Sequence, residues 1–235
     1  DIQNARTQEA VVGAARNWGH WSTPSQVSLS GHLEQKDIAG SAGESVHAVY
    51  LGYRNAFRKT DQLVSPRKGV IGTLQLGTAI PGLASRNFVR ATAKATFLWP
   101  LGESSDLTLR GEAGIVAADS RFGIPSSFLF RTGGDTTVRG YAFESLGVRQ
   151  GDAIVGGRYQ LVGSAEFTRW ISGDWGAAAF VDVGNAFDNL GRVTLARGYG
   201  VGARWRSPVG PFRADLAYGE VSRKVRLHFS VGFSF

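Results

Sequence analysis

Apolar and polar residues alternate over almost the whole chain, which is the pattern of strands with one face against an apolar medium. The final stretch, VRLHFSVGFSF at 225–235, shows this alternation without a break. No segment shows a sustained helical period, and turn residues separate the alternating runs. Eleven runs can be counted, of which the first is the least regular: 9–21, 27–34, 45–54, 69–80, 88–99, 106–116, 159–171, 175–187, 196–207, 210–219 and 225–235.

The length and charge of these runs favour a membrane-spanning sheet over a soluble one. Strands in soluble sheets usually have about 5–6 residues, whereas a tilted strand that crosses a membrane needs about 9–11. Arg, Lys, Glu and Asp stand in the middle of the polar faces, where a dry core would not accept them unpaired. Both features are explained if the apolar faces meet lipid and the charged faces line a wet lumen. The sequence therefore predicts an all-β fold, a transmembrane antiparallel β-barrel with about 11–12 visible strands.

Composition narrows the classes of function. The formal net charge is +7, but Lys and Arg are scattered singly, which argues against a nucleic-acid partner. The chain has no cysteine, and its four histidines lie on separate segments without zinc-ligand spacing. Ser230, His228 and Asp215 are the residue types of a hydrolase triad, but such a combination arises easily in a lumen rich in serine. We expect no catalytic residue, no metal and no cofactor.

The connection at 121–157 is the least strand-like part of the chain, and connections of this length are usually functional or disordered. It contains TGGDTTVRGYAFESLG at 132–147. The next two runs carry GSAEF at 163–167 and FVDVGNAF at 180–187, and GVGARWRSPVGPFRADLAY follows at 200–218. In this order, the motifs resemble those of BamA/TamA-type outer-membrane assembly barrels, with the closest similarity to the TamA branch. SPRKG at 65–69 has a counterpart there as well.

The resemblance implies that the 121–157 loop folds back into the lumen and that its arginine docks against acidic residues of the wall. The motif residues are Val138, Arg139, Gly140 and Tyr141. Glu166 and Asp182 fall on lumen faces of successive strands, and a guanidinium can bond such carboxylates in bidentate fashion. Glycines on the lumen face of the 196–207 run leave room for the loop: Gly198, Gly200 and Gly202. In one alternative, Arg139 is an ordinary exposed loop residue. In another, Glu166 and Asp182 are solvated lumen charges that pair with Arg204, Arg206 or Arg213.

The resemblance also implies a function and a location. It predicts an insertion or translocation barrel in the outer membrane of a Gram-negative bacterium, acting through a seam between its first and last strands. Its partners would be lipopolysaccharide and phospholipid, client outer-membrane or autotransporter polypeptides, and a periplasm-spanning protein. The terminal strand would be an assembly signal, carried by Phe229, Phe233 and Phe235. The alternatives are the translocator of a patatin-type autotransporter and a passive pore for small solutes.

The strand count bears on the domain organisation. The resembled family has sixteen strands and amino-terminal POTRA domains, whereas eleven is an odd number and bacterial single-chain barrels have an even one. Residues 1–235 are therefore expected to be one outer-membrane barrel domain or, as we favour, its carboxyl-terminal part. A smaller closed barrel of twelve strands and a barrel completed by a partner are the alternatives.

Overall fold

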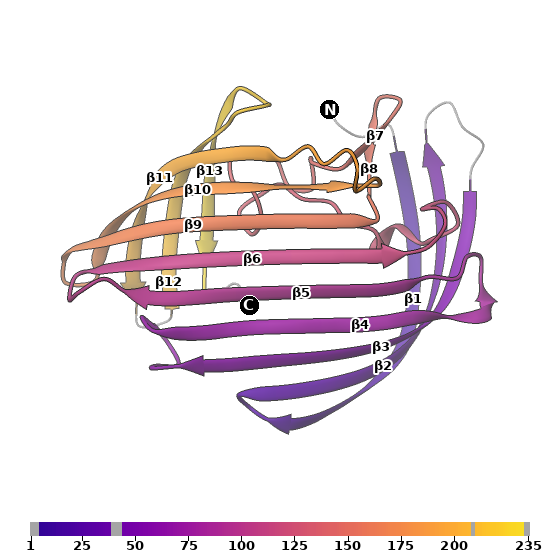
Figure 1. Ribbon diagram of the computed structural model, residues 1–235, viewed down its shortest axis with the longest axis horizontal. Helices are drawn as coiled ribbons and strands as arrows, with labels where there is room; N and C mark the ends of the chain where they lie inside the picture. Colours follow the sequence, from indigo (N-terminus) through magenta and orange to yellow (C-terminus); the bar gives the residue numbers. More distant parts are fainter. Residues whose placement is uncertain (1–4, 39–43, 208–209, 233–235) are drawn as a thin grey trace.

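The eleven predicted strands form one antiparallel sheet, in which each strand pairs with its neighbours in the chain (Figure 1). The computed structural model describes residues 5–38, 44–207 and 210–232. The strands of the sheet, in order, are β1 (Ala5–His20), β2 (Thr23–Ile38), β3 (Glu44–Thr60), β4 (Gly69–Ala84), β5 (Val89–Pro100), β6 (Ser105–Ala117), β9 (Tyr159–Ser172), β10 (Trp175–Phe187), β11 (Ala196–Ser207), β12 (Gly210–Gly219) and β13 (Lys224–Val231).

The sheet is strongly curved. In Figure 1 the central strands run across the view, whereas β1 at one end and β12 and β13 at the other stand at a steep angle to them. This is the coiling expected when a long antiparallel sheet twists in one sense. Within the described residues, β1 and β13 are not paired with each other, so each has one edge without a neighbouring strand.

The first four strands are longer than the alternation predicted, and β4 continues to Ala84. Strand β1 begins at Ala5, β2 extends over Thr23–Ile38, and β3 continues to Thr60. The extra residues of β3 pair with β4, from Ala56 opposite Thr73 to Thr60 opposite Gly69. Backbone hydrogen bonds between strands do not require alternating apolar and polar side chains. The strands therefore stay paired beyond the residues at which this alternation ends.

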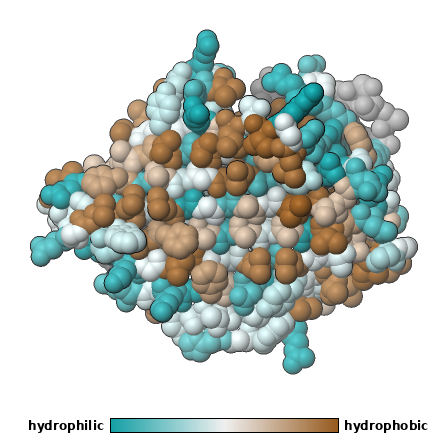
Figure 2. All heavy atoms as spheres, viewed as in Figure 1, coloured by the Kyte–Doolittle hydropathy of each residue, from teal (hydrophilic) through white to brown (hydrophobic). Residues whose placement is uncertain are grey.

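The two faces of the sheet differ in the way that the sequence predicted. Along β10, exposed Trp175, Ala177, Ala179 and Val181 alternate with buried residues that include Phe180 and Asp182. Along β13 the outward residues Val225, Leu227, Phe229 and Val231 are all well exposed. Figure 2 shows apolar side chains gathered across the outer face, with strongly hydrophilic ones mainly at its margins.

The segment between β6 and β9 lies against the inner face of the sheet and provides much of its core. It contains the 3-10 turn η1 (Ser126–Phe128) and a small hairpin of β7 (Val148–Gln150) and β8 (Ala153–Val155). Phe128, Leu129 and Phe130 pack with Phe88 and other buried residues, and Val138 and Tyr141 pack in a second cluster. We call residues 118–158 the lumen loop. Among the described residues, no helix is long and apolar enough to cross a membrane.

Candidate functional site

Arg139 of the lumen loop is bonded to the wall of the barrel. Its Nε and Nη2 donate to the two oxygens of Asp182 on β10, at 2.7 and 2.9 Å, and its backbone N–H donates to the same carboxylate at 3.0 Å. Its Nη1 donates to Glu166 Oε2 on β9 at 2.7 Å. The bidentate geometry is that of a strong charge-assisted pair. The structure thus brings together Arg139, Glu166 and Asp182.

Two further residues complete an ion network. Arg139 Nη1 also donates to Asp215 Oδ2 on β12 at 3.0 Å. Arg204 on β11 donates through Nε to Glu166 Oε1 at 2.9 Å and through Nη1 to Asp215 Oδ1 at 2.6 Å. Glu166 therefore pairs with Arg139 and with Arg204 at once, so docking of Arg139 and pairing of Glu166 with Arg204 are not exclusive. The alternative in which Arg139 is an exposed residue is wrong, because Arg139 is buried. The network joins the loop to four consecutive strands: β9, β10, β11 and β12.

The network is largely shielded from solvent. Asp182 is fully buried and Arg139 nearly so, and the Phe180 ring lies 3.4 Å from the Arg139 guanidinium carbon. Burial alone would lower the pKa of Arg139, but the hydrogen bonds and charges of Asp182 and Glu166 outweigh it and raise the pKa above its usual value. Arg139 is therefore permanently charged. Removing one partner would leave buried charges uncompensated, which is more costly than the pair is favourable.

The neighbours of Arg139 fix the path of the loop. Gly140 has φ of +90°, and a Cβ there would lie 2.6 Å from the backbone nitrogen of Gly219, so a larger residue would be both strained and crowded. Its N–H donates to His228 Nε2 on β13 at 3.0 Å. The Tyr141 hydroxyl donates to the carbonyl of Arg197 at 2.8 Å and accepts from the N–H of Val221 at 3.0 Å.

The three glycines of β11 lie under groups of the site. A Cβ on Gly198 would overlap the carbonyl oxygen of Arg139, and one on Gly202 would overlap Asp215 Oδ1. A Cβ on Gly200 would lie 2.8 Å from the Phe180 ring. The close approach of loop and wall therefore depends on the absence of side chains at these positions.

A second attachment of the lumen loop was not predicted from the sequence. Residues 122–130, which we call the aromatic anchor, lie against β1–β5. Ser126 N–H donates to Glu34 at 2.5 Å, and Arg90 Nε donates to the carbonyl of Phe128 at 3.0 Å. The Phe128 ring lies 4.5 Å from the Tyr50 ring and 5.0 Å from the Phe88 ring. The apolar run Phe128–Leu129–Phe130 inside a long polar loop was the available signal.

The remaining predicted residues lie elsewhere. Phe229 is 68% exposed on the outer face of β13, while Phe233 and Phe235 lie outside the described residues. Asp215 directs its oxygens to Arg139 and Arg204, and His228 accepts from Gly140. Among the described residues, no hydrogen bond joins Asp215, His228 and Ser230 in the manner of a hydrolase triad.

An antiparallel sheet of long strands, apolar outside and charged inside around an inserted loop, defines a β-barrel of the outer-membrane class. The model of the Omp85 superfamily domain matches residues 16–235, so the chain belongs to that superfamily. The predicted resemblance at the level of the superfamily, the all-β fold and the outer-membrane location are confirmed. The assignment to the TamA branch stays a prediction.

Among curated proteins, the chain is similar to the outer membrane protein assembly factor BamA of Neisseria meningitidis serogroup B. The two are 29% identical over 198 residues, which cover 68% of this chain and 25% of that protein. The chloroplastic outer envelope protein 80 of Arabidopsis thaliana is 31% identical over 114 residues, covering 44% of this chain and 14% of that protein. The chain thus spans a quarter or less of the length of these relatives.

Among solved structures, BamA from Haemophilus ducreyi lacking POTRA domains 1–3 aligns with a TM-score of 0.80 and 13% identity. The alignment covers 98% of this chain and 55% of that one. CdiB from Acinetobacter baumannii aligns with a TM-score of 0.58 and 15% identity, covering 95% of this chain and 41% of that one. At these identities the likeness shows the fold alone.

Proposed function

We propose that this chain is the membrane barrel portion of a protein that inserts polypeptides into the outer membrane or translocates them across it. The match of the Omp85 superfamily domain to residues 16–235 carries the proposal. Strand β13 pairs with β12, and no other described strand pairs with its second edge. Such an edge presents backbone N–H and C=O groups that an incoming strand can pair with by β-augmentation. The match to a BamA named as an assembly factor supports it.

In this mechanism the barrel opens at a seam beside β13, and the lumen loop keeps the adjoining wall intact. Arg139 contacts β9, β10 and β12 directly, and Arg204 adds β11 through the shared carboxylates. A wall tied to one guanidinium resists splaying when its edge is engaged by a client. Val138, Arg139, Gly140 and Tyr141 would therefore act as a lock that stabilises the open barrel.

The partners follow from the two faces of the sheet. The exposed apolar outer face would contact lipopolysaccharide and phospholipid, and the seam would receive client outer-membrane or autotransporter polypeptides. A periplasm-spanning partner and a role of Phe229, Phe233 and Phe235 as an assembly signal stay predictions. The same holds for the interpretation of residues 1–235 as one barrel domain or its carboxyl-terminal part.

Disulfide trapping tests the seam directly, since the chain has no cysteine of its own. Leu227→Cys places a thiol on the outer face of β13, where the native side chain is 59% exposed. A client outer-membrane protein with one cysteine in its terminal strand would be folded into vesicles containing the variant. We expect a disulfide between client and barrel that forms during insertion and disappears once insertion is complete.

Leu161→Cys is the matched control, because Leu161 is an exposed leucine of the outer face on β9, a strand paired on both sides. Trapping at residue 227 but not at residue 161 supports the seam. Equal trapping at both positions, or none, would be the result for a passive pore and would refute the mechanism. If the barrel instead translocates a passenger of its own chain, a cysteine at residue 227 should form a disulfide with that passenger and not with a separate client.

A further inference from the structure

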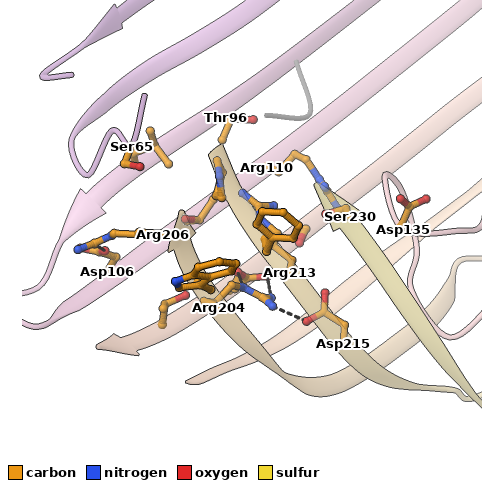
Figure 3. Close-up of a pocket in the computed structure, with 18 of the residues that line it drawn as sticks. Ser65, Thr96, Asp106, Arg110, Asp135, Arg204, Arg206, Arg213, Asp215 and Ser230 are labelled. Carbon is orange, nitrogen blue, oxygen red and sulfur yellow. Dashed lines mark hydrogen bonds and ion pairs between the residues drawn. The ribbon is translucent and has the colours of Figure 1, made fainter. Parts of the chain in front are cut away.

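A cavity of about 150 Å³ lies beside the ion network, on the inner face of the sheet (Figure 3). It is lined by the lumen loop at Asp135, Thr136 and Arg139, by residues 65–67 before β4, and by residues of β4, β5, β6, β9, β11, β12 and β13. Because roughly 10–15 Å³ is enough space for one water molecule, the cavity has room for a small polyatomic ion with its waters.

The cavity wall carries more positive than negative charge. Six arginines line it against four carboxylates, and the carboxylates are Asp106, Asp135, Glu166 and Asp215. Arg67 and Arg206 share Asp106, while Arg139 and Arg204 share Glu166 and Asp215. Within the described residues, Arg110 and Arg213 have no carboxylate partner.

These two arginines also have few hydrogen bonds. Arg110 Nη2 donates to the carbonyl of Thr137 at 3.2 Å, and its buried Nε has no partner among the described residues. Among the described residues, the side chain of Arg213 makes neither a hydrogen bond nor an ion pair. The charge of Glu166 attracts this guanidinium, whereas the positive charges of Arg204, Arg110 and Arg139 all repel it. Holding such groups together away from bulk water is unfavourable unless a negative charge joins them.

We propose that the cavity binds an oxyanion of the phosphate type between Arg110 and Arg213. A tetrahedral phosphate offers several acceptor oxygens, so two guanidinium groups from different walls can each bond it. Ser230 and Thr108 line the same cavity and can supply hydroxyl donors. The bound group would join β6 to β12 beside the lock. This site is independent of the proposed function in protein assembly.

The charge balance predicts that phosphate changes which protein, wild type or Arg213→Gln, unfolds at the higher temperature. An arginine with only a structural role would not produce this dependence on phosphate. In phosphate-free buffer, replacing Arg213 by glutamine removes an unpaired charge and costs no described hydrogen bond. We therefore expect Arg213→Gln to unfold at the same or a higher temperature than wild type there. In saturating phosphate, wild type should unfold at the higher temperature, because the ligand stabilises it more than the variant.

The experiment measures thermal unfolding of the purified protein in neutral detergent at constant ionic strength, with phosphate exchanged for chloride. We expect phosphate to stabilise wild type. The control variant Arg149→Gln, which replaces an exposed arginine of the same loop, should be stabilised equally. Arg213→Gln and Arg110→Gln should bind phosphate at least ten-fold more weakly than wild type. Competition by short-chain phosphatidylglycerol, but not by phosphatidylcholine, would identify a lipid phosphate as the occupant. Lack of competition would identify the free ion. Stabilisation no greater than that by chloride, or equal in Arg213→Gln, would overturn the proposal.

Discussion

At the scale of single residues, the site combines long charged side chains with positions that have none. Arg139 can reach Asp182 through its side chain and its backbone N–H together only because its main chain lies close to the wall. Gly198 permits this approach, since a Cβ there would overlap the Arg139 carbonyl oxygen. The attachment of the loop therefore depends on the absence of a side chain at Gly198 as much as on the guanidinium of Arg139.

Gly198→Ala should displace the loop from β11. The added methyl cannot be accommodated without a shift of backbone, so we expect a loss of about 1–3 kcal/mol in the free energy of unfolding, as for other overpacked sites. Urea unfolding in detergent would measure this loss. Trypsin should also cleave after Arg139 faster in the variant than in wild type, because the motif would leave the wall more often.

Gly111→Ala is the control. Gly111 also lies inside a strand of the same sheet, but a Cβ at this position meets no atom within 4 Å. Its free energy of unfolding should stay within about 0.5 kcal/mol of wild type. If the two variants lost the same stability, the close contact at Gly198 would not explain the effect.

At the scale of elements, the lumen loop is attached twice. The motif attaches it to β9–β12, and the aromatic anchor attaches it to β1–β5. The loop thus connects the two ends of the sheet through its interior, and among the described residues β1 and β13 are not paired with each other. Loss of either attachment should loosen one half of the loop and leave the other in place.

Phe128→Ala should release the aromatic anchor. The ring is 7% exposed and lies against Tyr50, Phe88 and His32, so we expect a loss of about 3–5 kcal/mol for its truncation. Hydrogen exchange should accelerate at residues 122–130 and remain slow at residues 138–141. Phe143→Ala, in the same loop but 72% exposed, should change neither quantity. Uniform acceleration over the whole loop would contradict two separate attachments.

Some of these elements could be predicted from the sequence and others could not, and the reasons are physical. Strands with lipid on one side and a lumen on the other must alternate, so all eleven were predicted, and the faces of Glu166 and Asp182 followed from the same period. The contact between Arg139 and Asp215 depends on strand tilt and register, which no single strand encodes. Phe128 stands in an aperiodic segment, where only tertiary packing decides whether an aromatic ring is buried.

At the scale of the whole molecule, the fold separates two solvents, lipid outside and water inside. This separation predicts that a charged side chain on the outer face destabilises the folded protein because it contacts the bilayer, and not because it contacts other side chains. Val181 on β10 is 49% exposed and stands opposite Ala165 on β9 and Tyr199 on β11. Val193, in the connection between β10 and β11, is 43% exposed. The two valines are therefore similarly accessible but would meet different surroundings.

Val181→Lys should cost about 2–4 kcal/mol in the free energy of folding into phospholipid vesicles, the value for lysine near the bilayer midplane. Val193→Lys should cost nearly nothing, because its side chain would lie beyond the hydrocarbon region. In a detergent micelle, where lipid is replaced by mobile amphiphiles, the difference between the variants should shrink. Equilibrium urea unfolding in both media measures all four values. Equal behaviour of the two variants in vesicles would mean that the face carrying Val181 does not meet lipid, whereas a penalty confined to Val181→Lys in vesicles would place the bilayer against β10.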